Sequence, residues 1–288
     1  MLNIFAIIIS YNDKENLFNC LSGLKRIEHK DITLHTYVVD NASNLFDPDE
    51  ILEQFPYVNL IKSKINLGFG TANNIVIKKA VEEKADYVLL LNQDTLPDKD
   101  PHFLAKLLGS MEENKTIGVS GPALEHYVND KLFYDYGGVL NLNLARGRHI
   151  NLTEAEYTKL VAKKTSIKTR DFVSAACMLI RVKNVLEAIR FDENYFLYLE
   201  DVDICIQIYK LGYKIVNIPE SMVFHVGGTS GGDFNKLYHS FKSSLRFVYK
   251  WIALPWKPIG FFYNLIFYPY LGIIWSLKRV KRRLLKSR

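Results

Sequence analysis

Cysteine is scarce in this sequence, and the three cysteines lie far apart. Cys20, Cys177 and Cys205 form no Cys-x-x-Cys pair and no paired framework, and each lies in an apolar or helical context. A disulfide scaffold is therefore excluded, and we expect reduced core thiols in a cytosolic protein. The N-terminus also lacks the basic segment and the cleavage site of a signal peptide, so residues 2–9 are predicted to form a first strand.

Two signatures of nucleotide-binding proteins are also missing. Gly68-x-Gly70 is followed by Asn73 where a dinucleotide fingerprint needs its third glycine, and the chain has no Walker lysine. The two glycines still precede a predicted helix over residues 71–84, whose N-terminal amides can meet a phosphate. The alternative is that Gly68 and Gly70 only form a tight turn.

Acidic residues are absent from the C-terminal end of the chain. Residues 278–288 carry seven basic side chains, which is more than the whole formal charge of +6, so the rest of the chain is slightly acidic. This distribution argues against a nucleic-acid-binding body and indicates that one end of the chain meets an anionic surface.

The chain becomes aromatic and basic from residue 234 onward. Residues 259–277 are long enough to span a bilayer, but Asn264, Pro269 and many tyrosines and tryptophans favour an interfacial position. The basic tail would then face anionic cytoplasmic lipid. The alternative is an aromatic face that packs on the body of a soluble protein.

An apolar run near the centre of the first half predicts a strand that is buried on both faces. The run, residues 87–91, ends at Asn92-Gln93-Asp94. In open α/β sheets, ligands bind beyond the carboxyl ends of the strands, and Asn92 and Asp94 face the same side of an extended chain. Their oxygens suit a Mg²⁺ or Mn²⁺ ion that holds a diphosphate. The alternative is a polar turn without a ligand.

Other predicted strands also end in polar residues. Residues 4–9 lead to Ser10-Tyr11-Asn12, residues 34–39 lead to Asp40-Asn41, and residues 58–61 lead towards Asn66. Buried strands alternating with helices predict an α/β fold with a mostly parallel, Rossmann-like sheet flanked by helices.

The second half of the chain carries weaker signals. Strands are predicted over residues 117–120, closed by Gly121-Pro122, and over residues 172–181 and 214–218. Within residues 134–169, alternation suggests a hairpin or edge strand, and residues 157–170 suggest a mobile loop.

Acidic residues open a helix that is predicted to end at Leu211. Glu200 and Asp201 stand at its start, where the helix dipole is expected to keep them ionised at neutral pH, the state that a general base needs. The alternative is that they only cap the helix. Asp203 lies on a polar stripe and is expected to be a solvated residue.

A histidine follows the last predicted strand. His225 is either a buried core residue or a nitrogen ligand to the same metal ion as Asp94. The glycine-rich residues 227–232 suggest a flexible loop that closes over a bound diphosphate.

These motifs together resemble the inverting glycosyltransferases of family 2, which have the GT-A fold, and most closely their bacterial rhamnosyltransferase-like branch. The resemblance covers about residues 4–250. Its marks, in chain order, are Ser10-Tyr11-Asn12, Val39-Asp40-Asn41-Ala42-Ser43, Asn66-Leu67-Gly68-Phe69-Gly70 with Ala72-Asn73-Asn74, Asn92-Gln93-Asp94, Glu200-Asp201-Val202-Asp203, and His225-Val226-Gly227-Gly228. It implies a glycosyltransferase domain over residues 1–233. The aromatic and basic composition of residues 234–288 predicts a separate helical region that associates with a membrane.

The resemblance implies a role for each matched residue. Asp201 would be the base that deprotonates the acceptor hydroxyl, supported by Glu200, and Asp94 and His225 would hold the Mn²⁺ or Mg²⁺ ion. Asn92 departs from the Asp-x-Asp of the wider family. The residues implied to bind the nucleotide sugar are Tyr11, Asn12, Asp40, Asn41, Asn66, Gly68, Asn74, Asn92 and Gln93.

The implied reaction is a direct displacement on a nucleotide sugar. The favoured donor is dTDP-rhamnose and the favoured acceptor is a glycan or a lipid-linked glycan of cell-surface polysaccharide synthesis, at the inner face of the cell membrane. The alternatives are a UDP-sugar donor (galactofuranose, glucose or N-acetylglucosamine) and a non-catalytic nucleotide-sugar-binding scaffold.

Overall fold

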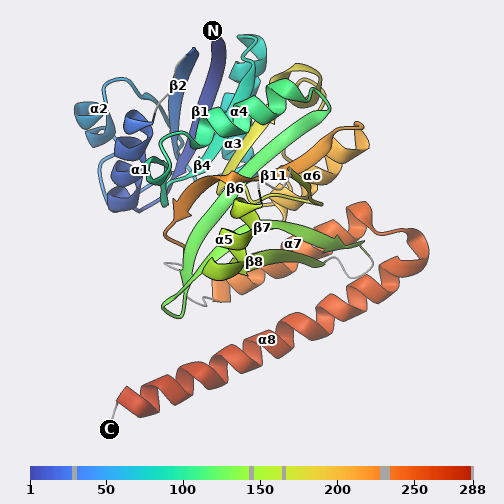
Figure 1. Cartoon of the computed structure of the whole chain (residues 1–288). Coiled ribbons are helices and arrows are strands. Elements are labelled where there is room, and N and C mark those ends of the chain that lie inside the picture. Colours follow the sequence, from blue (N-terminus) through green and yellow to red (C-terminus); the bar gives the residue numbers. More distant parts are fainter. Residues whose placement is uncertain (28–30, 143–145, 164–166, 228–233, 287–288) are drawn as a thin grey trace.

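The computed structural model describes residues 1–27, 31–142, 146–163, 167–227 and 234–286, with side chains up to residue 277 (Figure 1). The strands are β1 (Leu2–Ser10), β2 (Ile32–Asp40), β3 (Asn59–Lys62), β4 (Tyr87–Asn92), β5 (Thr95–Leu96), β6 (Ile117–Val128), β7 (Lys131–Asn141), β8 (Arg146–Thr153), β9 (Lys168–Thr169), β10 (Cys177–Arg181) and β11 (Lys214–His225). The helices are α1 (Lys14–Arg26), α2 (Glu50–Gln54), α3 (Phe69–Glu82), α4 (Phe103–Glu113), α5 (Glu154–Ala162), α6 (Glu200–Lys210), α7 (Phe234–Trp251) and α8 (Lys257–Lys286).

The strands form one mixed sheet in the order β3-β2-β1-β4-β10-β6-β11-β5. β1 pairs in parallel with β2 and β4, and β2 pairs in parallel with β3. β10 is antiparallel to both of its neighbours. The carboxyl ends of β1, β2 and β4 therefore meet at the same edge of the sheet.

Helices cover both faces of the sheet, as the unbroken apolar strands predicted. Residues from α3, α6 and α7 build the core on one face, and residues from α1, α2 and α4 build the core on the other. All the side chains from Tyr87 to Leu91 are buried. The α/β architecture with covered strands is confirmed.

Two strands are longer than predicted. β6 does not stop at Gly121-Pro122 but continues to Val128, paired with β11, which continues to His225. A register shift in this pairing between Ile218 and Met222 carries the ladder past the proline. Asn217 Nδ2 donates a hydrogen bond to the Pro122 carbonyl at 2.8 Å and so satisfies it. The strand end predicted at this proline is therefore wrong.

The region from residue 134 to residue 169 is largely ordered. β7 and β8 form the predicted hairpin. The predicted loop over residues 157–170 is wrong, because it begins inside α5, which Thr153 and Glu156 cap reciprocally. The Tyr157 ring stacks on Tyr134 at 4.0 Å. Residues 164–166 lie outside the described residues. The strand predicted from residue 172 begins only at Cys177.

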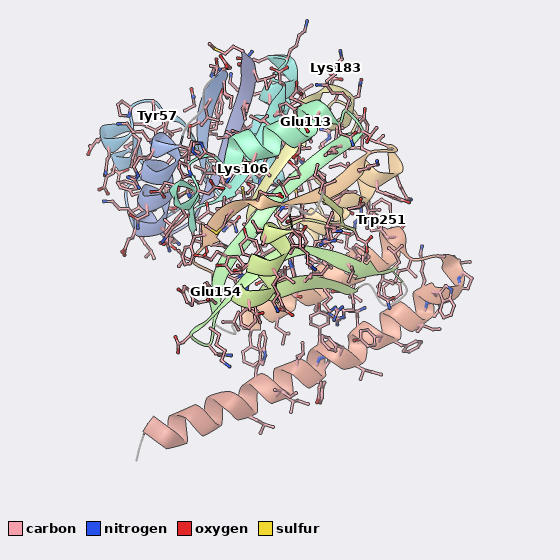
Figure 2. The ribbon with its side chains drawn as sticks, in the orientation of Figure 1. Tyr57, Lys106, Glu113, Glu154, Lys183 and Trp251 are labelled. Carbon is pink, nitrogen blue, oxygen red and sulfur yellow. The ribbon has the colours of Figure 1, made fainter. Side chains whose placement is uncertain are left out.

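Asp203 was expected on a solvated face, and that expectation is wrong. The side chain is 0% exposed because α7 covers this face of α6. Its carboxylate accepts hydrogen bonds from Trp251 Nε1 at 2.7 Å and from Lys250 Nζ at 2.9 Å. Trp251 lies where the end of α7 meets the body (Figure 2). Phe247 of α7 also belongs to the core that α3 and α6 build, so α7 packs as part of the same hydrophobic core.

Replacing Asp203 with alanine is expected to lower the free energy of unfolding by about 3 kcal/mol, because Trp251 Nε1 and part of the Lys250 charge lose a buried acceptor. Urea denaturation of the purified protein measures this. The control is Asp49→Ala, which removes an exposed pair with Lys62 and should cost less than about 1 kcal/mol. Equal losses in the two variants would contradict the anchoring role of Asp203.

Candidate active site

A cavity of about 530 Å³ lies at the carboxyl ends of β1, β2 and β4. It brings together eight residues that the sequence pointed to: Tyr11, Asn12, Asn41, Asn66, Gly68, Asn92, Gln93 and Asp94. The remaining lining residues are Ile9, Asp13, Phe69, Phe196, Leu197 and Lys236. Polar groups from five separate segments therefore converge where open α/β sheets bind their ligands.

Hydrogen bonds between the loops fix the shape of this cavity. Gln93 Oε1 accepts from the Tyr11 amide at 2.9 Å, and Gln93 Nε2 donates to the Tyr11 carbonyl at 3.2 Å. Asn41 Nδ2 donates to Asn66 Oδ1 at 2.9 Å. The Tyr11 side chain is 46% exposed and remains available to a planar ligand.

Two of the residues predicted to bind the nucleotide sugar are not in the cavity lining. Asp40 is buried behind the lining and accepts a hydrogen bond from the Ser43 amide at 3.1 Å. Asn74 donates to the Phe191 carbonyl at 2.9 Å and accepts from the Phe191 amide at 3.1 Å. Asn74 therefore joins α3 to the segment before α6, and its position does not support the predicted contact with the nucleotide sugar.

Gly68 stands where the chain approaches a neighbouring backbone closely. Its φ is +77°, and a Cβ atom there would lie 2.4 Å from the Phe196 carbonyl oxygen. The same oxygen accepts a hydrogen bond from the Phe69 amide at 3.0 Å. A glycine is therefore required at this position, because only a residue without a Cβ atom allows Phe196 to lie this close to the cavity.

Asp94 and His225 form a close pair at the cavity. The short antiparallel pairing of β5 with β11 places them together, with His225 Nε2 3.2 Å from Asp94 Oδ1. Burial opposes ionisation of Asp94, but the hydrogen bond and the charge of His225 outweigh it and lower the pKa of this carboxyl. The flexible loop was predicted over residues 227–232, and residues 228–233 lie outside the described residues.

This pair fits a divalent ion that also binds a diphosphate. A carboxylate oxygen and an imidazole nitrogen are suitable ligands for Mn²⁺. Within the described ranges, no group of three or more His, Cys, Asp or Glu side chains gathers as a closed metal site. Two protein ligands leave coordination positions for phosphate oxygens, as nucleotide-bound ions require.

A second cavity of about 260 Å³ contains Glu200 and Asp201. The chain runs directly from the first cavity to the second, because Phe196 and Leu197 line the first and Tyr198 and Leu199 line the second. Tyr198 and Leu199 both have positive φ, at 71° and 67°. Such strained backbone is held by the surrounding structure and is typical of functional sites.

The expectation that the helix dipole keeps both carboxylates ionised is wrong. Burial raises the pKa of Glu200, and the charge of Asp201 raises it further. Burial also raises the pKa of Asp201, although the charge of His149 acts in the opposite direction. The effect of burial on the two pKa values therefore outweighs the effect of the helix dipole. When only one of the two carboxyl groups is ionised, the negative charge is favoured on Asp201.

Several residues of the second cavity were missed by the sequence analysis. His149 and Arg146 come from β8, which carries no recognisable motif. His149 Nδ1 lies 2.7 Å from Asp135 Oδ2, and the pKa of His149 is raised: burial lowers it, but the hydrogen bond and charge of Asp135 outweigh that effect. In the first cavity Lys236 of α7 was also missed. Only the packing of the β7–β8 hairpin and of α7 against the rest of the protein places these residues in the two cavities.

The sheet, its flanking helices and the cavity at the strand ends define the GT-A class of glycosyltransferases. The chain belongs to the family described as "Glycosyl transferase family 2", whose sequence model matches residues 5–185. It is therefore a glycosyltransferase.

Its relatives extend over most of the chain. It is 25% identical to an N-acetylglucosaminyl-diphospho-decaprenol L-rhamnosyltransferase of Mycobacterium tuberculosis, over 98% of this chain and 96% of that protein. It is 27% identical to the dTDP-rhamnosyl transferase RfbF of Shigella flexneri, over 78% of this chain and 70% of that protein. The crystal structure of GalNAc-T7 with UDP, GalNAc and Mn²⁺ superposes with a TM-score of 0.64 at 16% identity, over 88% of this chain and about half, 52%, of that protein.

Proposed function

We propose that this protein transfers L-rhamnose from dTDP-rhamnose onto a hydroxyl of a lipid-linked glycan in cell-surface polysaccharide synthesis, with inversion at the anomeric carbon. The observation that carries this proposal is the pair of consecutive cavities, one lined by Asp94, which is paired with His225, and the other lined by Asp201. The names of the mycobacterial and Shigella relatives support rhamnose as the sugar and the Shigella name supports dTDP as the carrier.

The first cavity holds the donor in this proposal. Tyr11 and Asn66 contact the base and ribose, and Lys236 attracts the diphosphate by its charge. Asp94 and His225 would hold a Mn²⁺ or Mg²⁺ ion, which would supply positive charge to the departing nucleoside diphosphate. The GalNAc-T7 structure, which was solved with UDP, GalNAc and Mn²⁺, shares this fold and supports a divalent ion here.

The second cavity supplies the base. Asp201 accepts the proton of the acceptor hydroxyl while the acceptor oxygen forms a bond to the anomeric carbon. The bond from that carbon to the phosphate oxygen breaks, and the nucleoside diphosphate leaves with the electron pair. Glu200, held protonated by burial beside Asp201, leaves the negative charge on the base. One carboxylate in contact with the nucleophile suffices, so no covalent sugar–enzyme intermediate forms.

The C-terminal helix places this chemistry at a membrane surface in our proposal. Within the described residues, Leu254–Leu277 is long and apolar enough to cross a bilayer, and only 17% of its most apolar part is buried inside the protein. Large apolar side chains on α8, such as Ile266 and Phe262, are 71% and 66% exposed. Together with the basic sequence that follows, they suit peripheral association with the inner face of the cell membrane.

The donor assignment is tested by thermal unfolding of the purified full chain with a panel of nucleotide sugars, with and without Mn²⁺. At a hundred times its Kd, a ligand stabilises the folded state by about 2.7 kcal/mol, which raises the Tm of a domain of this size by roughly 5 °C or more. We expect the largest shift with dTDP-rhamnose and a requirement for Mn²⁺. A larger shift with a UDP-sugar would contradict the rhamnosyl assignment, and no shift with any donor would contradict the proposed transfer.

A further inference from the structure

Arg146 lines the cavity that holds Asp201, and it has no anionic partner in the part of the chain that the structure describes. The guanidinium carbon of Arg146 lies 3.8 Å from the ring centroid of Phe267 and 5.2 Å from those of Tyr263 and Tyr268. Its Nε and Nη2 atoms are buried and have no hydrogen-bond partner among the described residues. Cation–π contacts offset only part of the cost of removing such a cation from water. The position therefore calls for an anion from outside the chain.

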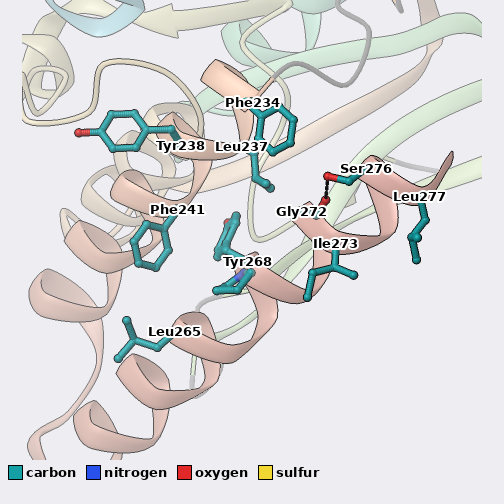
Figure 3. Close-up of a pocket in the computed structure, with 11 residues that line it drawn as sticks. Phe234, Leu237, Tyr238, Phe241, Leu265, Tyr268, Gly272, Ile273, Ser276 and Leu277 are labelled. Atoms are coloured by element: carbon teal, nitrogen blue, oxygen red, sulfur yellow. Dashed lines mark hydrogen bonds between the residues drawn. The ribbon is translucent and has the colours of Figure 1, made fainter. Parts of the chain in front are cut away.

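An apolar cavity of about 570 Å³ lies between α7 and α8, beside this arginine. Phe234, Leu237 and Phe241 project into it from α7, and Leu265, Tyr268 and Ile273 project from α8 (Figure 3). Its lining is mostly apolar, and Leu265 and Ile273 are 52% and 61% exposed, so the cavity is an apolar groove that opens to the outside of the protein.

Tyr268 lies between the two cavities. Its ring lines both the apolar cavity and the cavity of Asp201 and Arg146. Its hydroxyl is held by Ser240 Oγ at 2.9 Å and by Ser244 Oγ at 2.6 Å, both on α7. The Asp201 carboxylate, the Arg146 guanidinium and the apolar cavity therefore lie in series, with the Tyr268 ring between the two cavities.

We propose that the cavity of Asp201 and Arg146 and the adjoining apolar cavity together bind a polyprenyl diphosphate-linked acceptor in one fixed direction. This inference rests on the proposed function. The sugar hydroxyl lies at Asp201, the diphosphate binds the Arg146 guanidinium, and the prenyl chain occupies the cavity between α7 and α8. A guanidinium makes strong charge-assisted hydrogen bonds to phosphate oxygens. The order of base, cation and apolar surface matches the order of sugar, diphosphate and hydrocarbon in such an acceptor.

The test compares two acceptors with the full chain, dTDP-rhamnose and Mn²⁺: N-acetylglucosaminyl diphosphate on a decaprenyl chain, and octyl N-acetylglucosaminide, which lacks the diphosphate. For Arg146→Gln, the ratio of kcat/KM for the first acceptor to that for the second should fall about 30-fold, chiefly through KM. Arg146→Lys, which keeps the charge, should recover part of the ratio. A merely structural role would lower both kcat/KM values together and leave the ratio unchanged, which would overturn the proposal.

The apolar cavity is tested by filling it. Gly272→Leu places a side chain against Leu237 inside the cavity, and it should abolish the preference for a decaprenyl over a five-carbon prenyl chain. Ile266→Leu, on the outward side of the same helix, should keep that preference. An unchanged preference in the Gly272 variant would overturn this assignment of the cavity.

The outcomes separate this inference from the function on which it rests. Wild-type transfer to the octyl glycoside but not to the diphosphate-linked acceptor overturns the inference and leaves the transferase proposal standing. A rise in the KM for dTDP-rhamnose in Arg146→Gln, with the acceptor ratio unchanged, would assign the arginine to the donor diphosphate and overturn the inference. If the wild type consumes no donor under any condition, the proposed function fails.

Discussion

The Asp201→Asn variant is expected to bind dTDP-rhamnose as the wild type does and to lose about 10²- to 10⁴-fold in kcat, the usual contribution of a general base. The asparagine side chain has the shape of the aspartate side chain. It keeps an oxygen that can accept the hydrogen bond that the Val202 backbone N–H donates to Asp201 Oδ1 at 2.8 Å. It has no basic site for the acceptor proton. Steady-state kinetics, with donor binding measured by calorimetry, separates the two effects.

Glu200→Gln is the matched control for that variant. Because burial and the neighbouring charge raise the pKa of Glu200, its protonated form resembles glutamine, and we expect a loss of about tenfold or less. Near-normal turnover in Asp201→Asn would remove Asp201 from the role of base. A larger loss in the Glu200 variant than in the Asp201 variant would assign the role to Glu200.

The same pair predicts the acid side of the pH profile. The pKa of Asp201 is raised by burial, so its base form is lost at a higher pH than that of an ordinary aspartate. Activity should therefore fall as the pH decreases through this raised pKa. The positive charge of His149 lowers the pKa of Asp201, so in His149→Gln the fall should move to higher pH. A profile that does not move in this variant would contradict the electrostatic coupling.

The Asp94→Asn variant is expected to weaken binding of the donor at least about 100-fold in the presence of Mn²⁺, because even residues that only support metal ligands contribute 10- to 100-fold. The change removes the carboxylate charge and keeps the size of the side chain. Calorimetric titration of dTDP with and without Mn²⁺ should show that the wild type depends on the ion and that the variant has lost this dependence.

Asp98→Asn is the control for Asp94. Asp98 follows four residues later, accepts a hydrogen bond from Arg26 at 2.7 Å, and does not line the donor cavity. Its variant should keep metal-dependent binding. Undiminished binding of dTDP by Asp94→Asn, with or without Mn²⁺, would contradict the assignment of Asp94 as a metal ligand.

The donor side of the site was largely predictable because its signals are local. Each strand is an apolar run that ends at a polar residue, and parallel strands place their carboxyl ends together. Tyr11, Asn41, Asn92 and Asp94 were therefore expected at one edge, and they line one cavity. Asn74 follows the same motif in sequence, but its place on α3 directs it to Phe191 instead.

The second cavity was much less predictable because its parts are distant in sequence. Asp203 looks solvated on the pattern of α6 alone, and only the packing of α7, more than forty residues later, buries it. In the same way Arg146 and His149 lie on β8 with no motif around them, and only the packing of this strand places them in the cavity of Asp201. The ionisation of Glu200 depends on the burial that this packing creates, which outweighs the local helix dipole.

The most direct measurement is the anomeric configuration of the product formed from dTDP-rhamnose, Mn²⁺ and a lipid-linked glycan acceptor, determined by NMR. We expect rhamnose on the acceptor with the configuration opposite to that in the donor, because one carboxylate, Asp201, faces the incoming hydroxyl and the displacement is direct. A product that retains the donor configuration, or release of free rhamnose without any glycoside, would contradict the proposed transfer.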